Sequence, residues 1–171
     1  MQSLESRTLL VANRGEIAIR VMEAAAALGM RTIAIFSEDD ANSLHVVRAD
    51  EARRLTGTGA AAYLDGDQIV AVAKDAGCQA IHPGYGFLSE NAAFARRCGE
   101  AGIIFTGPSP ELLELFGDKV EARKLAQRCG VPVLPGTAGP TSLDDAKAFF
   151  HSASANPVVI KAVAGGGGRG I

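Results

Sequence analysis

The sequence predicts an α/β protein in which a doubly wound parallel sheet is followed by the beginning of a second, differently organised domain. Short apolar runs without polar alternation, typical of strands covered on both faces, alternate with segments of helical periodicity. Prolines and a glycine then cluster at 106–110, and the order of elements changes after them. We therefore expect a sheet domain over residues 1–109 and an incomplete domain over residues 110–171.

The first strand–helix–strand unit is expected at the start of the chain. Residues 8–13 form a short apolar run, Gly15 turns the chain, a helix follows over 16–28, and a second apolar run occupies 31–37. A unit of this length predicts parallel strands with a right-handed crossover. The residues expected to share the inward face of the helix are Ile17, Val21, Ala25 and Leu28.

The same alternation continues to about residue 107, which makes the first domain Rossmann-like. Ser89 is expected to be the N-cap of a helix over 89–101, because serine before a periodic segment typically accepts a bond from the first turn. The other expected elements are strands at 51–56, 78–82 and 103–106, a loop at 57–66, a helix at 67–76, and Phe94, Ala95 and Cys98 as inward positions of helix 89–101.

The second domain is predicted to be mainly helical before its last strand. Asp118 and Glu121 have the spacing of a capping box at the start of a helix that ends near Cys129. The other expected elements are a helix at 112–116, a proline-rich connection at 132–140, a helix from Ser142 to about Ser152, and a strand at 158–163.

Composition excludes several classes of protein. The hydrophobic fraction of 47% is sufficient for a packed core, and 5% aromatic content without tryptophan predicts an aliphatic one. A net charge of -2 with mixed signs argues against a nucleic-acid surface, and no apolar run reaches the length of a membrane span. The three cysteines are expected to be small apolar fillers rather than a disulfide frame or zinc site. Together with an N-terminus unlike a secretory signal, this predicts a cytoplasmic protein.

The last stretch of the chain carries the strongest functional signal. Lys161 lies in the predicted strand, and consecutive glycines at 165–168 are followed by Arg169 and Gly170. Glycine amides can turn inward around an anion, and phosphate is the anion that most often uses such a loop. A flexible linker is the alternative, but linkers usually mix glycine with serine and have no strand before them. The pattern predicts a nucleotide phosphate site.

The first strand-to-helix turn does not have the pattern of a dinucleotide site. It contains a single glycine, Gly15, where the fingerprint needs three, and Glu16 would place a carboxylate near a pyrophosphate. The helix after this turn has a polar face with Glu16, Arg20 and Glu23, which is explained either by solvent exposure or by a subunit contact.

Two further stretches are candidate binding elements. The segment H-P-G-Y-G-F-L-S-E-N at 82–91 leaves the carboxyl end of a predicted strand, where open α/β sheets place their ligands. It is either a structural turn, with Tyr85 covering the edge of the core, or the lining of a crevice. The segment G-D-K at 117–119 places Lys119 in the first turn of a helix, where a solvated lysine is the simpler explanation.

These stretches together resemble the start of biotin carboxylase. The matching segments are A-N-R-G-E-I-A-I-R at 12–20, residues 82–91, G-D-K at 117–119, and V-I-K-A with G-G-G-G-R-G at 159–170. Biotin carboxylase is the ATP-dependent component of acyl-CoA carboxylases, pyruvate carboxylase and urea carboxylase. The resemblance implies a Rossmann-like domain that precedes an ATP-grasp region, and a ligase that uses MgATP and bicarbonate to carboxylate biotin through carboxyphosphate.

The resemblance also implies roles for residues. Lys119, Lys161, Gly167, Gly168 and Ile171 would contact ATP, with isoleucine at 171 where the family usually has methionine. Tyr85 and Glu90 would lie toward biotin and bicarbonate. No catalytic residue is expected within the chain, and the Mg²⁺ ligands are expected after residue 171, so the chain alone is expected to be inactive.

The implied partners are a biotin carboxyl carrier domain or protein, a carboxyltransferase component, and a second copy in a homodimer that uses the helix with Arg20. An acyl-CoA carboxylase of fatty acid metabolism is the expected type, although the final acceptor is not determined by these residues. Two alternatives stay open: a non-catalytic dimerisation or scaffold module, and another ATP-grasp ligase such as a carbamoyl phosphate synthase, against which the 82–91 motif argues.

Overall fold

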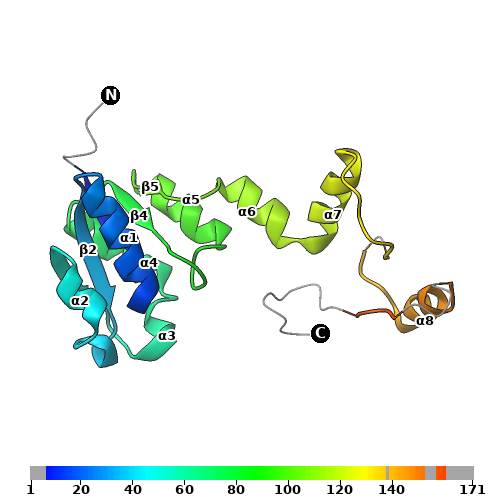
Figure 1. The fold of residues 1–171 in the computed structure, drawn as a ribbon, viewed down its shortest axis with the longest axis horizontal. Helices are drawn as coiled ribbons and strands as arrows, with labels where there is room; N and C mark the ends of the chain where they lie inside the picture. Colours follow the sequence, from blue (N-terminus) through cyan, green and yellow to red (C-terminus); the bar gives the residue numbers. More distant parts are fainter. Residues whose placement is uncertain (1–6, 138, 153–156, 161–171) are drawn as a thin grey trace. The chain divides into compact units, whose positions relative to one another are not determined.

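A computed structural model describes residues 7–137, 139–152 and 157–160 of the chain (Figure 1). The chain divides into two compact units, residues 1–113 and residues 114–171. Both are described separately below. The predicted phosphate-binding residues Lys161, Gly167, Gly168 and Ile171 lie outside the described residues.

The first unit contains a parallel sheet of five strands in the order β3-β2-β1-β4-β5. This order confirms the predicted doubly wound architecture, because the chain builds outward from β1 in one direction and then crosses to its other side. In the register, Leu10 lies opposite Ile33 of β2 and Ile81 of β4. The strands are β1 Thr8–Val11, β2 Arg31–Phe36, β3 Glu51–Arg54, β4 Ala80–His82 and β5 Ile104–Phe105.

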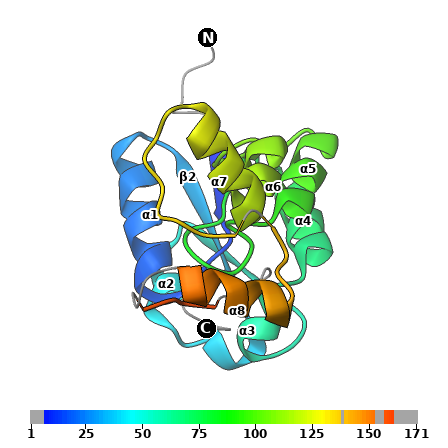
Figure 2. The ribbon, with the colours of Figure 1, turned by 90° about the vertical axis from the view of Figure 1, so that its right-hand side faces the viewer.

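Helices cover both faces of this sheet (Figure 2). Strand β1 shows the reason, because its apolar residues alternate between two cores. Leu10 and Ala12 belong to a core with residues of α4 and α5, whereas Leu9 and Val11 pack with α1. A strand that is apolar on both faces therefore needs helices on both sides. The helices of this unit are α1 Gly15–Ala27, α2 Leu44–Arg48, α3 Gly59–Ala62, α4 Gly66–Asp75 and α5 Ala92–Glu100, with a short 3-10 helix, η2, at Glu38–Asp40.

The inward face of α1 agrees with the predicted one only at Ala25. Its buried residues are Ala18, Met22 and Ala25, whereas Ile17 and Val21 are half-buried. Leu28, just after the helix, is 56% exposed. Both stripes have helical spacing, but small alanines allow α1 to approach β1 and β2 closely, and this close packing selects the alanine stripe.

The N-cap of α5 also differs from the prediction. Asn91, not Ser89, accepts a bond from the backbone of Phe94, at 2.9 Å from Oδ1 to N. The amide of Ser89 instead donates to the carbonyl of Gly86 at 2.9 Å, so Ser89 belongs to the preceding turn. The inward positions Phe94, Ala95 and Cys98 are all buried, as predicted.

The second unit contributes helices whose described residues are not buried. Asp118 caps α7 as predicted, since its carboxylate accepts from the amides of Val120 and Glu121. Ser142 caps α8 through the amide of Asp145. Residues 158–160 of the predicted strand 158–163 form neither helix nor strand, and the rest of that strand lies outside the described residues. The helices are α6 Pro110–Gly117, which spans the boundary between the two units, α7 Lys119–Arg128 and α8 Leu143–Ser152.

The cysteines follow the prediction only in part. Cys78 and Cys98 are buried and unpaired, and burial raises the pKa of each thiol to about 11. Cys129 is exposed, so it is not the apolar filler that the sequence predicted. Among the described residues, no helix has the length and apolar character needed to cross a membrane.

Candidate functional site

The candidate site lies at the carboxyl ends of β1, β2 and β4, where parallel strands deliver the following loops to one edge of the sheet. The strand order reverses between β1 and β4, and ligands of open α/β sheets bind next to such a reversal. The chain leaves β1 at Asn13 and Arg14, leaves β2 at Ser37, and leaves β4 into the turn that begins at Pro83.

The turn after β4 rests directly on the turn after β1. The buried side-chain amide of Asn13 donates to the carbonyls of Pro83 at 2.8 Å and Tyr85 at 2.9 Å. A Cβ on Gly84 would lie 2.5 Å from the same nitrogen, and Gly84 has φ +65°. Only glycine permits this approach without strain. The turns after β1 and β4 are therefore packed directly against each other through the side chain of Asn13.

The predicted residues of segment 82–91 now have positions. Tyr85 is 72% exposed and Glu90 is exposed, so both side chains are accessible to a ligand. His82 is half-buried, and its Nδ1 accepts from the amide of Gly84 at 3.0 Å. Burial lowers the pKa of His82 and favours the neutral ring that this bond requires. His82 is thus bonded within the turn, whereas Tyr85 is exposed and does not cover the edge of the core.

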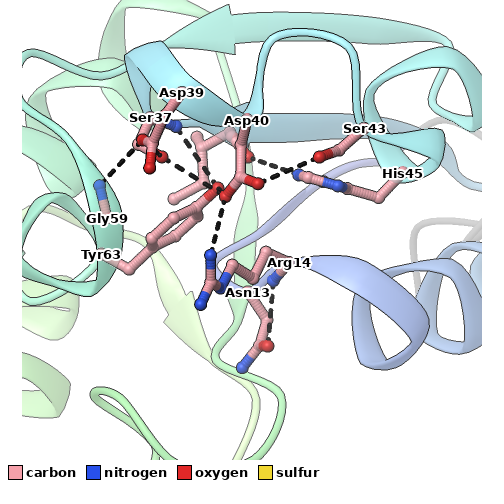
Figure 3. A network of polar contacts seen from close by, with 10 residues as sticks. Asn13, Arg14, Ser37, Asp39, Asp40, Ser43, His45, Gly59 and Tyr63 are labelled. Carbon is pink, nitrogen blue, oxygen red and sulfur yellow. Dashed lines mark hydrogen bonds and ion pairs between the residues drawn. The ribbon is translucent and has the colours of Figure 1, made fainter.

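A polar network joins the loops after β1 and β2 (Figure 3). Asp40 is its centre: Oδ2 accepts from the Tyr63 hydroxyl at 2.8 Å and from Arg14 at 3.2 Å, and Oδ1 accepts from Ser43 at 3.0 Å. The Tyr63 hydroxyl in turn accepts from the amide of Ser37 at 3.3 Å. Asp39 continues the network, with Ser37 Oγ at 2.7 Å and the amide of Gly59 at 2.8 Å from its Oδ1.

The network determines the charge states of its members. Burial raises the pKa of Asp40, but the bonds from Tyr63, Ser43 and Arg14 outweigh it, so the pKa is below its ordinary value. Burial and the bond to Asp40 raise the pKa of Tyr63 to about 12. Asp40 is therefore a carboxylate and Tyr63 a neutral phenol at neutral pH, which is the pairing their hydrogen bond needs.

Tyr63 connects this network to the turn after β4. Its ring stacks on Phe87 with centroids 5.2 Å apart, and the guanidinium carbon of Arg14 lies 5.7 Å from the centre of the same ring. Phe87 has φ +42°, a conformation that non-glycine residues rarely adopt. Sequence reasoning missed Asn13, Asp40 and Tyr63 as site residues. The one available signal was the acidic run Glu38-Asp39-Asp40 shortly after an apolar strand, because the partners of these residues are distant in sequence.

An open pocket of about 430 Å³ lies on the α1 side of the sheet. Ile17, Val21 and Leu28, the residues expected to face the core, line it together with Ile104 of β5. Arg7, Arg20 and Tyr85 also contribute to its lining. This part of the sheet face is therefore apolar and accessible in the described residues.

The ATP-side prediction falls mostly outside the described residues. Lys119 is the exposed first residue of α7, in the second unit. Asp118 accepts from the amides of Val120 and Glu121, so these two amides are already bonded, and Lys119 offers a positive charge to a phosphate. Among the described residues, no group of three or more acidic, histidine or cysteine side chains is arranged to hold a metal ion.

Comparison with known proteins identifies related families for both parts of the chain. Residues 5–113 match the family model "Biotin carboxylase, N-terminal domain", and residues 118–171 match "Carbamoyl-phosphate synthase L chain, ATP binding domain". The chain is 53% identical over 165 residues to a putative urea carboxylase of Emericella nidulans, covering 96% of this chain and 13% of that protein. It is 51% identical over 174 residues to pyruvate carboxylase of Bacillus subtilis, covering 100% of this chain and 15% of that protein.

Solved structures agree with these matches. The biotin carboxylase domain of a single-chain bacterial carboxylase is 55% identical with a TM-score of 0.88, covering 91% of this chain and 36% of that chain. A Hydrogenobacter thermophilus 2-oxoglutarate carboxylase domain, solved as a dimer with MgADP, ADP and bicarbonate, is 46% identical with a TM-score of 0.88, covering 95% and 36%. The chain thus spans about a seventh of these curated relatives and about a third of the solved domains. It belongs to the biotin carboxylase family and corresponds to the N-terminal region of the biotin carboxylase part of biotin-dependent carboxylases.

Proposed function

We propose that this chain supplies the biotin-side wall and part of the ATP site of a biotin carboxylase. The complete polypeptide would use MgATP and bicarbonate to carboxylate biotin on a carrier through carboxyphosphate. The observation that carries this proposal concerns the segment after β4. Its backbone is held by hydrogen bonds from Asn13, whereas the side chains of Tyr85 and Glu90 are exposed. The close relatives named above support the reaction class.

On the ATP side we propose Lys119, Lys161, Gly167, Gly168 and Ile171 as contacts. The exposure of Lys119 fits a role as a point charge toward phosphate, and Asp118 already accepts from the amides of Val120 and Glu121. Phosphoryl transfer depends mainly on positioned cations and amides, so such residues bind and orient rather than react. When bound, Mg²⁺ would neutralise phosphate charge, and we propose that its ligands lie outside this chain.

On the biotin side we propose Tyr85 and Glu90. A phenol that is 72% exposed at the end of a rigid turn can contact an apolar ring and donate a hydrogen bond at the same time. We propose no catalytic residue within the chain, and we propose that its residues bind and orient the substrates. We further propose that residues 1–109 form the N-terminal domain and that residues 110–171 begin the ATP-grasp region.

The proposed partners are a biotin carboxyl carrier, a carboxyltransferase component and a second copy of the chain. Multi-domain carboxylases among the solved relatives support the first two, and a relative solved as a domain dimer supports the third. An acyl-CoA acceptor, in fatty acid metabolism, remains our proposal for the type of enzyme, supported by a relative that is a long-chain acyl-CoA carboxylase. Free cysteines support a reducing, cytoplasmic location.

A non-catalytic dimerisation module is the second candidate. The observation that favours it is the apolar pocket beside α1, where Ile17, Val21 and Leu28 are open to a partner. Sedimentation of the chain together with ATP titration separates the two functions. Dimerisation without nucleotide affinity, even when the chain is joined to the rest of a biotin carboxylase domain, would favour the module.

The direct test is bicarbonate-dependent ADP release with free biotin. The chain would replace the corresponding region of its 55%-identical bacterial relative, so that a complete domain is assayed beside the 171-residue chain alone. We expect turnover by the chimera and none by the chain alone. Turnover by the chain alone would mean that the phosphate and metal sites have been placed wrongly.

A matched pair of lysines tests the ATP side of the same chimera. Lys119→Ala should raise KM for ATP about tenfold, the effect expected for losing one charged contact to a phosphate. Lys124→Ala, on the same helix and ion-paired with Glu121 at 2.8 Å, should change it by less than about twofold. Equal effects of the two substitutions would remove Lys119 from the proposed site.

A further inference from the structure

We propose that Asn13 is a positioning residue that holds the turn at 83–86 and thereby fixes the place of the Tyr85 side chain. The role of that side chain toward biotin rests on the proposed function, whereas the role of Asn13 in holding the turn does not. Asn13 lies in the first strand-to-helix turn, far in sequence from the segment that it contacts.

The chemistry of the side chain explains why asparagine is needed there. Asn13 is 3% exposed, and its side-chain nitrogen donates to the carbonyls of both Pro83 and Tyr85. Its oxygen accepts from the amide of Arg14 at 2.9 Å. Both N–H groups and the carbonyl are therefore used. Aspartate would offer no donor to the two carbonyls, and serine would offer one on a shorter arm.

The turn is shaped to sit on this amide. Gly84 lies so close to Asn13 that a Cβ on it would collide with the nitrogen and the carbon of the side-chain amide. Gly86 has φ +67° and Phe87 has φ +42°, so the chain passes through the left-handed region repeatedly within a few residues. This conformation is strained at the non-glycine residue Phe87, and such strain persists only where the surroundings hold it in place.

The turn has supports on two sides. Asn13 holds the carbonyls of Pro83 and Tyr85, and Tyr63 stacks on the ring of Phe87. The side chain between these supports is not itself buried, since Tyr85 is 72% exposed. A side chain that is itself exposed but has its backbone held by buried residues on two sides is suited to be a preorganised binding group.

A fluorescence measurement on the chain tests the positioning directly. The chain contains no tryptophan, so Tyr85→Trp places a single reporter at the position in question. In this background, Asn13→Ala and Asn13→Ser should increase the amplitude of fast local depolarisation in time-resolved anisotropy about twofold. Thr32→Val is the matched control, because Thr32 lies in β2, is 2% exposed, and donates its hydroxyl to Asp50 away from the turn. It should leave the amplitude unchanged.

Circular dichroism identifies which variants are folded. If Asn13→Ala does not fold, the anisotropy amplitude is measured in Asn13→Ser and Gly84→Ala instead. Gly84→Ala displaces the same amide from the other side. An unchanged amplitude in folded Asn13 variants, or an equal increase in Thr32→Val, overturns the proposal.

The second readout is kinetic and uses the chimera with Tyr85 intact. Asn13→Ser should raise KM for biotin about tenfold, because a group displaced by a fraction of an ångström loses its orientation, while KM for ATP should change by less than about twofold. Equal increases in both constants would indicate general damage and overturn the positioning role in the reaction. If the chimera without substitutions shows no biotin-dependent turnover, this result counts against the proposed function but not against the role of Asn13. The anisotropy measurement still tests whether Asn13 holds the turn at 83–86.

Discussion

The two units of this chain contain similar helices that are stabilised in different ways. The first unit buries its apolar residues in two clusters on either side of a parallel sheet, and all the buried hydrophobic residues that the structure describes lie between Leu9 and Ile103. In the second unit, α7 and α8 have no buried residue and are held by caps and local ion pairs. The sheet unit is therefore stabilised by a hydrophobic core of its own, whereas the described helices of the second unit are stabilised by short-range interactions.

The largest expected effect tests this difference with two leucines. Leu10→Ala removes a fully buried side chain from the core, and should lower the free energy of unfolding by about 2–5 kcal/mol. Leu134→Ala, at a position that is 84% exposed in the second unit, should change it by less than about 0.5 kcal/mol. Urea unfolding followed by circular dichroism measures both. Similar losses would show that Leu134 is covered in solution and that the contrast between the units is wrong.

The next effect concerns the polar network, which is found only in the sheet unit among the described residues. Tyr63→Phe removes the hydroxyl that donates to Asp40 and accepts from Ser37, and leaves both partners less satisfied. We expect a loss of about 1–3 kcal/mol in the free energy of unfolding. Because Asp40 has a lowered pKa, its stabilising contribution is present above its unfolded pKa and is lost as the pH falls through its folded pKa.

The variant should therefore lose less stability than the parent on acidification, since the Tyr63 bond is one cause of the lowered pKa. Unfolding curves at several acidic pH values measure this difference. Ser142→Ala, which removes a hydroxyl from a cap in the second unit, is the matched control. If both substitutions change the acid dependence equally, the network is not its source.

A smaller effect compares two N-caps. Asn91→Ala and Asp118→Ala each remove a side chain that accepts from a helix amide, and each cap is worth about 1 kcal/mol. Because α5 packs Phe94 and Cys98 into the core, Asn91→Ala should lower the midpoint of global unfolding. Asp118→Ala should reduce helical signal without moving that midpoint. An equal shift of the unfolding midpoint in Asp118→Ala and Asn91→Ala would show that the two caps do not differ in this way.

These contrasts also explain what the sequence could predict. Parallel strands followed from apolar runs, and the start of α7 followed from Asp118, because both signals are local. Periodicity identified an apolar face of α1 but chose Ile17 and Val21 over Ala18 and Met22, since it does not register how closely a helix approaches a sheet. The segments η2, α2 and α3 are too short to establish a period.

The candidate site was predictable only as a segment. The 82–91 stretch contains glycines, a proline and an exposed tyrosine, and these residue types indicate a turn near a ligand. Its support by Asn13 and Tyr63 joins residues that are distant in sequence, and no local pattern records such a contact. The glycine loop after Lys161, the strongest sequence signal, stays a prediction because it lies outside the described residues.

The smallest expected effect is a mild acid sensitivity that belongs to the sheet unit. Burial lowers the pKa of His45 and of His82, with the bond between His45 and the Ile35 carbonyl opposing the effect of burial at His45. Below the ordinary histidine pKa of 6.5 the unfolded chain takes up protons that the folded chain does not, so stability falls as the pH decreases.

His45→Gln should flatten the dependence of the unfolding free energy between about pH 7 and about pH 5. Ile33→Val, which shortens a fully buried side chain and removes no hydrogen bond to a titrating group, should shift the curve without changing its slope. Parallel curves for the parent and His45→Gln would show that the buried ring of His45 does not contribute, and would leave His82, beside the Tyr85 turn, as the residue to substitute.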